Sequence, residues 1–237
     1  MIRAKNLSFS YPEDQRPALT DLNFQIGRGS LCCLLGANGS GKTTLLRILA
    51  GLLRAEGELC FAQASPTRRL LPQNPELYIL GATVEEDLLL GLEQRSPVVD
   101  KALALLKQFD LGDKREQPVH YLSFGEKRKL CLASALAAEP ELLLLDEPFA
   151  GLDYPSALFV RENMTRNKEI GLTQIFSTHD LDLTADLVEH FIVLRQGLII
   201  AQGSGAEVAP YLEQAGTRQP CQWYLGRHAP LWQGDQS

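Results

Sequence analysis

The sequence predicts an α/β protein with a mostly parallel sheet, an N-terminal antiparallel β subdomain and an inserted helical subdomain. Three observations predict this class. A glycine-rich loop, Gly36 to Thr43, follows a short apolar run and opens a helix. A second apolar run, Leu142 to Leu145, ends in two acidic residues. Strand-like and helical segments alternate around a stretch, about residues 75–140, that has helical patterns only, and such alternation is typical of parallel sheets with right-handed crossovers.

The composition is that of an ordinary globular chain. Of 237 residues, 45% are apolar and 22% charged, which suits one large domain or a domain with an embedded subdomain. The net charge of −6 and the isoelectric point near 5.3 argue against nucleic acid as a partner. The densest basic run, at residues 127–129, is expected to be a solvated helix face. Five cysteines without paired or metal-ligand spacing indicate a reduced, cytoplasmic setting, and no apolar window approaches the roughly 18 to 20 residues of a membrane span.

The elements follow in order from the amino terminus. Residues 2–9 and 18–26 predict two short strands around a polar, proline-containing loop. Residues 31–35 form a continuous apolar run, which predicts a strand covered on both faces. A helix is expected from Lys42 to about Leu52, after the glycine-rich loop. Further strands are expected at 57–62, 69–71, 142–145 and 173–177, and a hairpin at 191–194 with 198–201.

The helical block is followed by the second half of the sheet and then by a tail. Thr83 and Glu86 form a capping-box pattern, and a longer helix is expected from Phe124 to about Ala138. We therefore predict a nucleotide-binding domain over residues 1–215, with its helical subdomain at about 75–140. Residues 216–237 form a C-terminal tail rich in Gln, Gly and Pro. Its two tryptophans, at 223 and 232, either anchor a partner or pack back on the domain, unless the tail stays mobile.

The glycine-rich loop fits the pattern G-x-x-x-x-G-K-[ST] at every fixed position, between an apolar run and a helix. This context excludes a chance glycine turn and predicts a P-loop NTPase with a RecA-like core. Glycines let backbone N–H groups point at phosphate oxygens, and the helix amino terminus adds a positive dipole end. Lys42 is expected to reach the β- and γ-phosphates of ATP and Thr43 to bind Mg²⁺. The residues predicted to bind nucleotide here are Gly36, Asn38, Gly39, Ser40, Gly41, Lys42, Thr43 and Thr44.

Polar residues at the ends of two later strands complete this half of the site. Asp146 and Glu147 follow the apolar run 142–145, at the sheet edge where ligands bind in open α/β sheets. Asp146 suits the shell of Mg²⁺, and Glu147 is placed to orient or deprotonate water. Acidic residues there can also cap a turn, and a lone histidine such as His179 is often structural. Gln73 is a candidate for sensing Mg²⁺ or the γ-phosphate, although its Pro-x-x-Pro setting is typical of loops.

The run Ser123-Phe124-Gly125-Glu126 fits the capping box S-x-x-E, which explains Ser123 and Glu126 structurally. It does not explain Gly125, because glycine costs about 1 kcal/mol relative to alanine within a helix. A glycine in the first turn is expected where something approaches the backbone closely, and a helix amino terminus with free N–H groups suits a γ-phosphate. The two interpretations are compatible.

Taken together, these motifs resemble those of the ATP-binding subunit of an ABC transporter over about residues 2–210. The resemblance rests on the ordered set Gly36–Thr43, Gln73, 122–126, 142–147, 150–153 and His179. It implies a homodimer or a pair of ABC ATPases in which Ser123, Gly125 and Glu126 of one subunit close on the ATP of the other. It also implies that Tyr11 stacks on adenine and that Asp153 crosses the dimer interface.

Three neighbourhoods narrow the resemblance to the ATPases of energy-coupling-factor importers, which take up cobalt, nickel, biotin and other vitamins. They are residues 9–12, 73–75 and 83–87. This group implies integral membrane partner subunits and a peripheral place on the cytoplasmic face of the cell membrane. The chain departs from the family pattern at Phe124, usually Gly, and Glu126, usually Gln. Activity is expected to survive, with Phe124 as the position that affects dimer closure.

Rival functions fit less well. A soluble ABC protein of translation would need two cassettes, and this chain has one. A chromosome or DNA-repair ATPase would need long coiled-coil arms between Thr43 and Ser123, which only about 80 residues separate. A small-molecule P-loop kinase would leave residues 122–126 unexplained.

Overall fold

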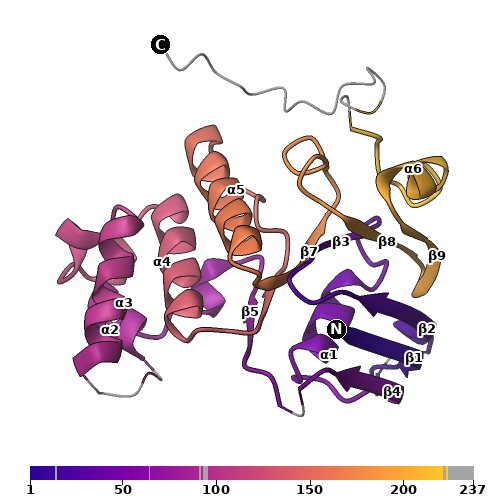
Figure 1. Cartoon of the computed structure of the whole chain (residues 1–237), viewed down its shortest axis with the longest axis horizontal. Helices are drawn as coiled ribbons and strands as arrows, with labels where there is room; N and C mark the ends of the chain where they lie inside the picture. The colour runs from indigo at the N-terminus through magenta and orange to yellow at the C-terminus, as the bar shows by residue number, and fades with distance from the viewer. Residues whose placement is uncertain (14, 64, 91, 93–95, 221–222, 224–237) are drawn as a thin grey trace.

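The computed structural model describes residues 1–13, 15–63, 65–90, 92, 96–220 and 223, and two sheets organise them (Figure 1). The larger sheet has six strands in the order β5-β6-β7-β3-β8-β9, all parallel except β9, which runs antiparallel to β8. These strands are β5 (Arg68–Leu71), β6 (Leu142–Leu145), β7 (Thr173–Thr178), β3 (Leu31–Leu35), β8 (His190–Arg195) and β9 (Leu198–Gly203). The predicted mostly parallel sheet is confirmed.

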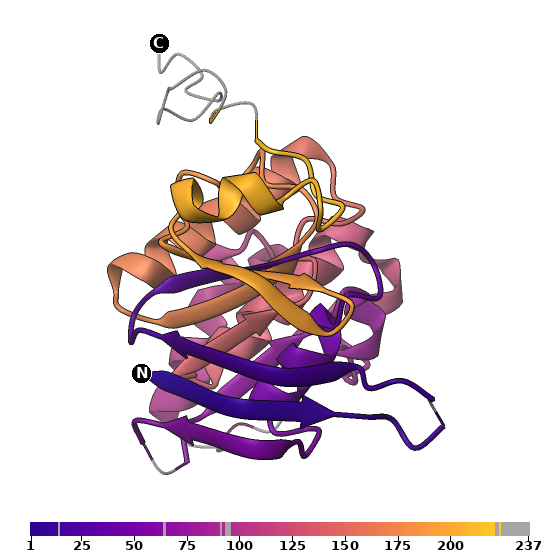
Figure 2. The same ribbon diagram turned by 90° about the vertical axis from the view of Figure 1, so that its right-hand side faces the viewer.

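The smaller sheet is the predicted antiparallel subdomain (Figure 2). It has the order β2-β1-β4, with β1 at Ile2–Phe9, β2 at Leu19–Ile26 and β4 at Glu56–Phe61. Helix α1 (Lys42–Leu49) packs its leucines into one apolar cluster with residues of both sheets. This helix ends earlier than predicted, because Gly51 follows it with a φ of +80°, a left-handed conformation that closes helices.

The central parallel strands β6, β7 and β3 are buried on both faces. All residues of β3 and β6 are buried, and alternate residues of β3 face different apolar clusters. Cys33 belongs to one cluster, and Cys32 to the other. Burial on both faces explains why these strands appear in the sequence as unbroken apolar runs.

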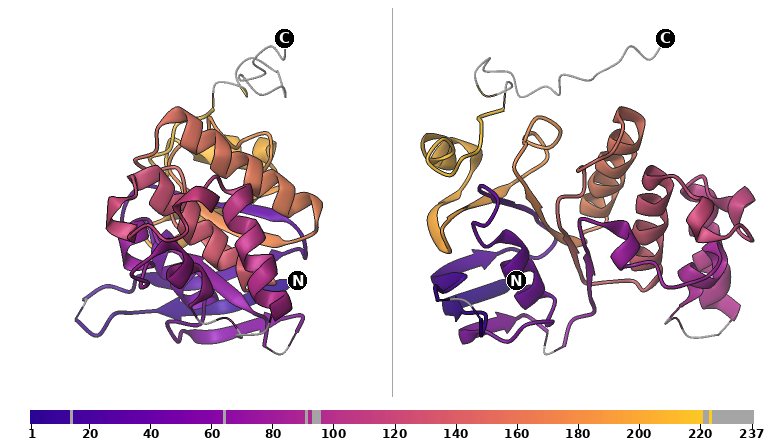
Figure 3. Two further views of the ribbon diagram at one scale, coloured as in Figure 1. Left: turned by 90° about the vertical axis from the view of Figure 1, so that its left-hand side faces the viewer. Right: turned by 180° about the vertical axis from the view of Figure 1, so that it is seen from behind.

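The predicted helical block stands to one side of the sheets (Figure 3). It contains α2 (Val84–Leu89), α3 (Ser96–Gln108) and α4 (Phe124–Ala137), joined by short 3-10 turns η1 (Pro75–Leu77), η2 (Gly112–Lys114) and η3 (Val119–Tyr121). The predicted capping box of Thr83 and Glu86 opens α2. Helix α5 (Tyr154–Glu169) connects β6 to β7, and α6 (Gly205–Val208) and η4 (Ala209–Tyr211) follow β9. No helix of the described residues is both long and apolar enough to span a bilayer.

Candidate nucleotide-binding site

The phosphate loop, Gly36 to Thr43, is shaped by glycines that no other residue could replace without strain. Gly36 has a φ of +147°, and a Cβ there would lie 2.2 Å from the Leu194 carbonyl oxygen. Gly41 has a φ of +108°, and its Cβ would lie 2.5 Å from a methyl carbon of Leu19. Within the described part of the chain, the backbone N–H groups of Asn38, Gly39 and Gly41 donate to no other protein atom. The loop can therefore present donors to phosphate oxygens, as its sequence predicts.

Lys42 carries the positive charge of this loop. The residue is 6% exposed, and its ammonium donates to the carbonyls of Gly36 at 2.7 Å and Ala37 at 3.2 Å. The same Nζ atom lies 3.7 Å from Oε1 of Glu147. The cation is thus enclosed between the phosphate loop and the end of β6, where it can contact phosphate and the β6 carboxylates together.

A chain of hydrogen bonds joins the loop to two strand ends. The Thr43 hydroxyl donates to Oδ2 of Asp146 at 2.7 Å, and the Ser177 hydroxyl donates to Oδ1 of the same carboxylate at 2.6 Å. Ser177 also accepts from the backbone N–H of Glu147 at 2.9 Å. The carboxylate and hydroxyl oxygens of Asp146 and Thr43 are hard donors of the kind Mg²⁺ prefers, so the pair fits the predicted metal site.

Glu147 occupies an unusual backbone conformation beside His179. Its φ is +45°, in the left-handed region that side chains rarely adopt. Oε2 lies 3.1 Å from Nδ1 of His179, whereas Oε1 is buried without a hydrogen-bond partner among the described residues. The imidazole is 59% exposed. A buried carboxylate oxygen with a free lone pair, next to an accessible imidazole, can accept a proton from a water molecule.

Three other predicted site residues are Tyr11, Gln73 and Asp153. Of these, Tyr11 lies beside the start of α1, next to the phosphate loop. The Tyr11 hydroxyl is 3.2 Å from the Thr44 hydroxyl, so the predicted adenine partner stands beside the start of α1. Gln73 is exposed, and no hydrogen bond joins its described side chain to Thr43 or Asp146. Asp153 caps α5 by accepting from the backbone N–H of Ser156 at 3.1 Å, and hydrogen bonds from Ser156 lower the pKa of Asp153.

The second predicted half of the site lies at the start of α4. The Ser123 hydroxyl accepts from the Glu126 N–H at 3.3 Å, and the Glu126 carboxylate accepts from the Ser123 N–H at 2.8 Å, which is the predicted capping box. Lys114 also pairs with Glu126, and this ion pair lowers the pKa of the Glu126 carboxyl. No hydrogen bond or ion pair among the described residues links Ser123–Glu126 with the phosphate loop.

The two unusual residues of this run contact α5 and the turn before it. A Cβ at Gly125 would lie 2.5 Å from the Ser156 hydroxyl, so Gly125 has a packing reason besides the predicted approach of a ligand. Phe124 is 40% exposed, and the other part of its ring lies against Gly151, where a Cβ would be 3.3 Å from the ring. Phe124 therefore fills space next to the segment that leads to Asp153.

The expectation of a solvated basic face at residues 127–129 is wrong. Arg128 is only 2% exposed, and its guanidinium donates to the carbonyls of Pro72 at 2.7 Å and Gln73. Burial lowers its pKa, and the Phe124 ring lies 5.9 Å from the guanidinium carbon. Lys127 pairs with Glu76 at 2.6 Å. Helix α4 is thereby fastened to the Gln73 segment, which charge density alone did not indicate.

Sequence reasoning also missed Ser177. This hydroxyl holds Asp146 and the Glu147 backbone together, and it lies near the end of β7, two residues before His179. The signal available for it was a polar residue directly after the apolar pair Ile175-Phe176, two residues before a candidate histidine.

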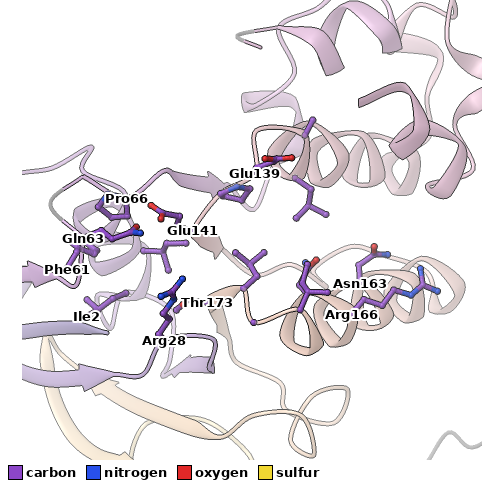
Figure 4. Close-up of a pocket in the computed structure, with 18 of the residues that line it drawn as sticks. Ile2, Arg28, Phe61, Gln63, Pro66, Glu139, Glu141, Asn163, Arg166 and Thr173 are labelled. Carbon is purple, nitrogen blue, oxygen red and sulfur yellow. The ribbon is translucent and has the colours of Figure 1, made fainter. Parts of the chain in front are cut away.

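A separate pocket of about 640 Å³ lies at the opposite edge of the larger sheet, where β6 and β7 begin (Figure 4). Arg28, Glu139, Glu141, Asn163 and Arg166 are among the residues around it. The phosphate loop follows the carboxyl end of β3, so this pocket is not the nucleotide site.

Known proteins resemble this chain in sequence and fold. A model of the ABC transporter family matches residues 19–150. The nickel import ATP-binding protein NikO of Rhodobacter capsulatus is 40% identical over 218 residues, covering 81% of this chain and 85% of that protein. The structure of CbiO1 from Clostridium perfringens, part of the ABC transporter complex CbiONQ, matches with a TM-score of 0.76 at 27% identity, covering 91% of this chain and 92% of that chain. The structure of a dimeric bacterial ABC transporter cassette matches with a TM-score of 0.76 at 25% identity, covering 86% of this chain and 98% of that chain.

The matched region contains both halves of the phosphate site, from the loop at Gly36–Thr43 to the carboxylates Asp146 and Glu147. It covers more than half of the chain, and the similarity to NikO and CbiO1 extends over most of the remainder. The protein therefore belongs to the ABC transporter family, as one of its ATP-binding subunits.

Proposed function

We propose that this subunit binds ATP with Mg²⁺, hydrolyses it in a dimer, and so drives import of a metal ion or vitamin through membrane partner subunits. The observation that carries the proposal is the chain of contacts from Thr43 through Asp146 and Ser177 to Glu147. It brings a phosphate loop, a metal-binding pair and a buried carboxylate to one sheet edge. Such a set suits phosphoryl transfer to water, which depends mainly on positioning and charge stabilisation.

Each residue has a separate part in that reaction. Lys42 and the loop N–H groups hold the β- and γ-phosphates, while Glu147 takes a proton from the water that attacks the γ-phosphorus. The bond from that phosphorus to the bridging oxygen breaks, and ADP leaves. His179 orients Glu147 through the 3.1 Å contact. Thr43 and Asp146, with Gln73, would hold Mg²⁺, which neutralises charge on the phosphates when bound.

A dimer completes the site in this proposal. In the part of the chain that the structure describes, Ser123, Gly125 and Glu126 make their contacts away from the phosphate loop. The helix amino terminus they form can meet the nucleotide of a second subunit, where its dipole favours phosphate. Asp153 lies just before α5, close to the Gly151 turn that Phe124 covers, and is proposed to cross the same interface.

The segment that follows Gln73 exposes apolar side chains that a membrane partner subunit could cover. Leu77, Leu80 and Leu90 are 73%, 77% and 55% exposed, although leucines are usually buried. Apolar side chains in the centre of an interface are typical of protein partners. The similarity to NikO, a nickel import ATP-binding protein, supports a metal ion as the cargo. We infer a peripheral place on the cytoplasmic face of the membrane, with residues 1–215 as the ATP-binding domain and 216–237 as its tail.

The test is the variant Glu147→Gln. It keeps the side-chain volume but removes the proton acceptor, so ATP binding should persist while hydrolysis falls at least about 100-fold. Glu139→Gln is a matched control, because Glu139 also has a left-handed backbone (φ +47°) but lies at the opposite end of the sheet, in an exposed ion pair with Lys101. Equal turnover in Glu147→Gln and Glu139→Gln would remove Glu147 from its role.

The transport part needs a different measurement. The subunit should co-purify from detergent-solubilised membranes with integral membrane proteins. Recovery only as a soluble protein bound to ribosomes or DNA would favour a translation or repair ATPase instead.

A further inference from the structure

A segment near the C-terminus of the chain contacts the phosphate loop. The backbone N–H of Ala37, the second residue of the loop, donates to the carbonyl of Ala215 at 2.8 Å. This hydrogen bond joins two residues that lie far apart in the sequence, one in the first fifth of the chain and one in the last. It fixes the first peptide of the loop just ahead of the free N–H groups of Asn38 and Gly39.

The segment around Ala215 is packed firmly enough to act on the loop. Ala215 and Thr217 are both buried, and the Thr217 N–H donates to the Leu212 carbonyl at 2.9 Å. Gly216 has a φ of +71°, and a Cβ there would lie 3.1 Å from the Cβ of Ala37. Ala37 and Gly216 both lie at the surface, and the approach is so close that Ala37 or residue 216 has to move when residue 216 gains a side chain.

The same segment also contacts the turn that follows His179. The Arg218 guanidinium lies 3.1 Å from a carboxylate oxygen of Asp182, three residues after His179. Beyond it, the Trp223 ring meets Phe191 of β8 edge to face, with ring centroids 5.6 Å apart, and covers Gly205. Trp223 therefore packs back on the domain, whereas Trp232 lies outside the described residues.

We propose that residues 215–218, here called the C-terminal strut, position the phosphate loop and so set the affinity of the subunit for nucleotide. The inference rests on the proposed binding of ATP by that loop. The direction of a loop N–H group decides its hydrogen bond to a phosphate oxygen, so a shift of a few tenths of an ångström at Ala37 weakens binding. A partner that moves the chain after residue 218 would act on ATP binding through the same contact.

The test compares Gly216→Ala with Gly171→Ala. Both glycines have left-handed backbones, with φ of +71° and +79°, so both substitutions introduce similar backbone strain. Only the new Cβ at residue 216 meets the phosphate loop, because a Cβ at Gly171 has nothing within 4 Å. We expect Gly216→Ala to weaken binding of Mg²⁺–ADP about fivefold, measured by calorimetry, and Gly171→Ala to leave it unchanged.

A second variant distinguishes the contact between residues 216 and 37 from a general loss of stability. Ala37→Gly removes the methyl group that the new Cβ would meet, so the double variant Ala37→Gly, Gly216→Ala should recover most of the affinity relative to Ala37→Gly alone. Hydrogen exchange at the Ala37 amide should be faster in Gly216→Ala than in the wild type, and unchanged in Gly171→Ala. Equal affinities of the two glycine variants, or no recovery in the double variant, would overturn the strut. If the wild-type protein bound no nucleotide, the proposed function itself would fail, whatever the exchange rates.

Discussion

The phosphate-loop cluster and the start of α4 are both predicted to touch ATP, yet they are built in opposite ways. In the cluster, Lys42, Asp146 and Glu147 are buried. Lys42 pairs with Glu147, and the Asp146 carboxylate accepts hydrogen bonds from Thr43 and Ser177, which come from other parts of the chain. At the start of α4, the Ser123 side chain bonds to Glu126 three residues away, and Phe124 is 40% exposed. One region is a closed network of distant residues, and the other is a local cap facing outward.

This difference separates what one subunit can do from what two must do. A closed network keeps its geometry without help, so one chain can bind nucleotide through the phosphate loop. The capping box at Ser123 and Glu126 forms hydrogen bonds within its own helix end. The exposed side of this helix end can bind a nucleotide only when a second subunit brings one to it. The contacts of Lys127 with Glu76 and of Arg128 with the carbonyls of Pro72 and Gln73 hold α4 to the segment that follows β5.

The largest effect is expected from breaking the closed network at Lys42. Lys42→Ala removes charge-assisted hydrogen bonds to phosphate, each worth about 1.5–3 kcal/mol, so nucleotide affinity should fall about 100-fold or more. Calorimetric titration with Mg²⁺–ATP measures this. Lys101→Ala, which removes the exposed partner of Glu139, is the control and should bind normally. Normal binding by Lys42→Ala as well would mean that the loop is not the phosphate site.

A change in the open cap should act on the dimer alone. Phe124→Gly removes the ring beside Gly151 and restores the usual family residue, so nucleotide affinity of one subunit should stay the same while ATP-dependent dimerisation and hydrolysis change severalfold. Analytical ultracentrifugation in the Glu147→Gln background would measure the dimer without turnover. The helix itself should lose about 1 kcal/mol, because glycine is a poor helix former. Loss of single-subunit binding would contradict the separation of the two regions.

The smallest effect is expected at Glu126. Its folded pKa is lowered chiefly by the hydrogen bond from Lys114, with a further contribution from the Ser123 N–H. A lowered pKa means that the carboxylate stabilises the fold above its unfolded pKa of about 4.3, and that this contribution is lost as the pH falls through the folded value. Urea midpoints from pH 7 to pH 3 should therefore fall more for the wild type than for Glu126→Gln. Parallel pH profiles would show that the pair contributes nothing.

The two regions also differ in how far their structure followed from the sequence. The phosphate loop was predictable residue by residue, since its glycines answer a local backbone need that any P-loop shares. The capping box was equally predictable because it is contained in four residues. Arg128 was not, because its burial depends on carbonyls more than fifty residues earlier in the chain, at Pro72 and Gln73. The packing reason for Gly125 depends in the same way on Ser156, which only the folded chain brings near.

The left-handed backbone at Glu147 has a consequence for how this protein can change. Such a conformation costs a side chain about 1–3 kcal/mol, and glycine adopts it freely. Glu147, the proposed general base, thus occupies a position where glycine would make the fold more stable. Mutational drift toward greater thermal stability would tend to erase catalysis at this position, so selection for transport has to act against stability at residue 147.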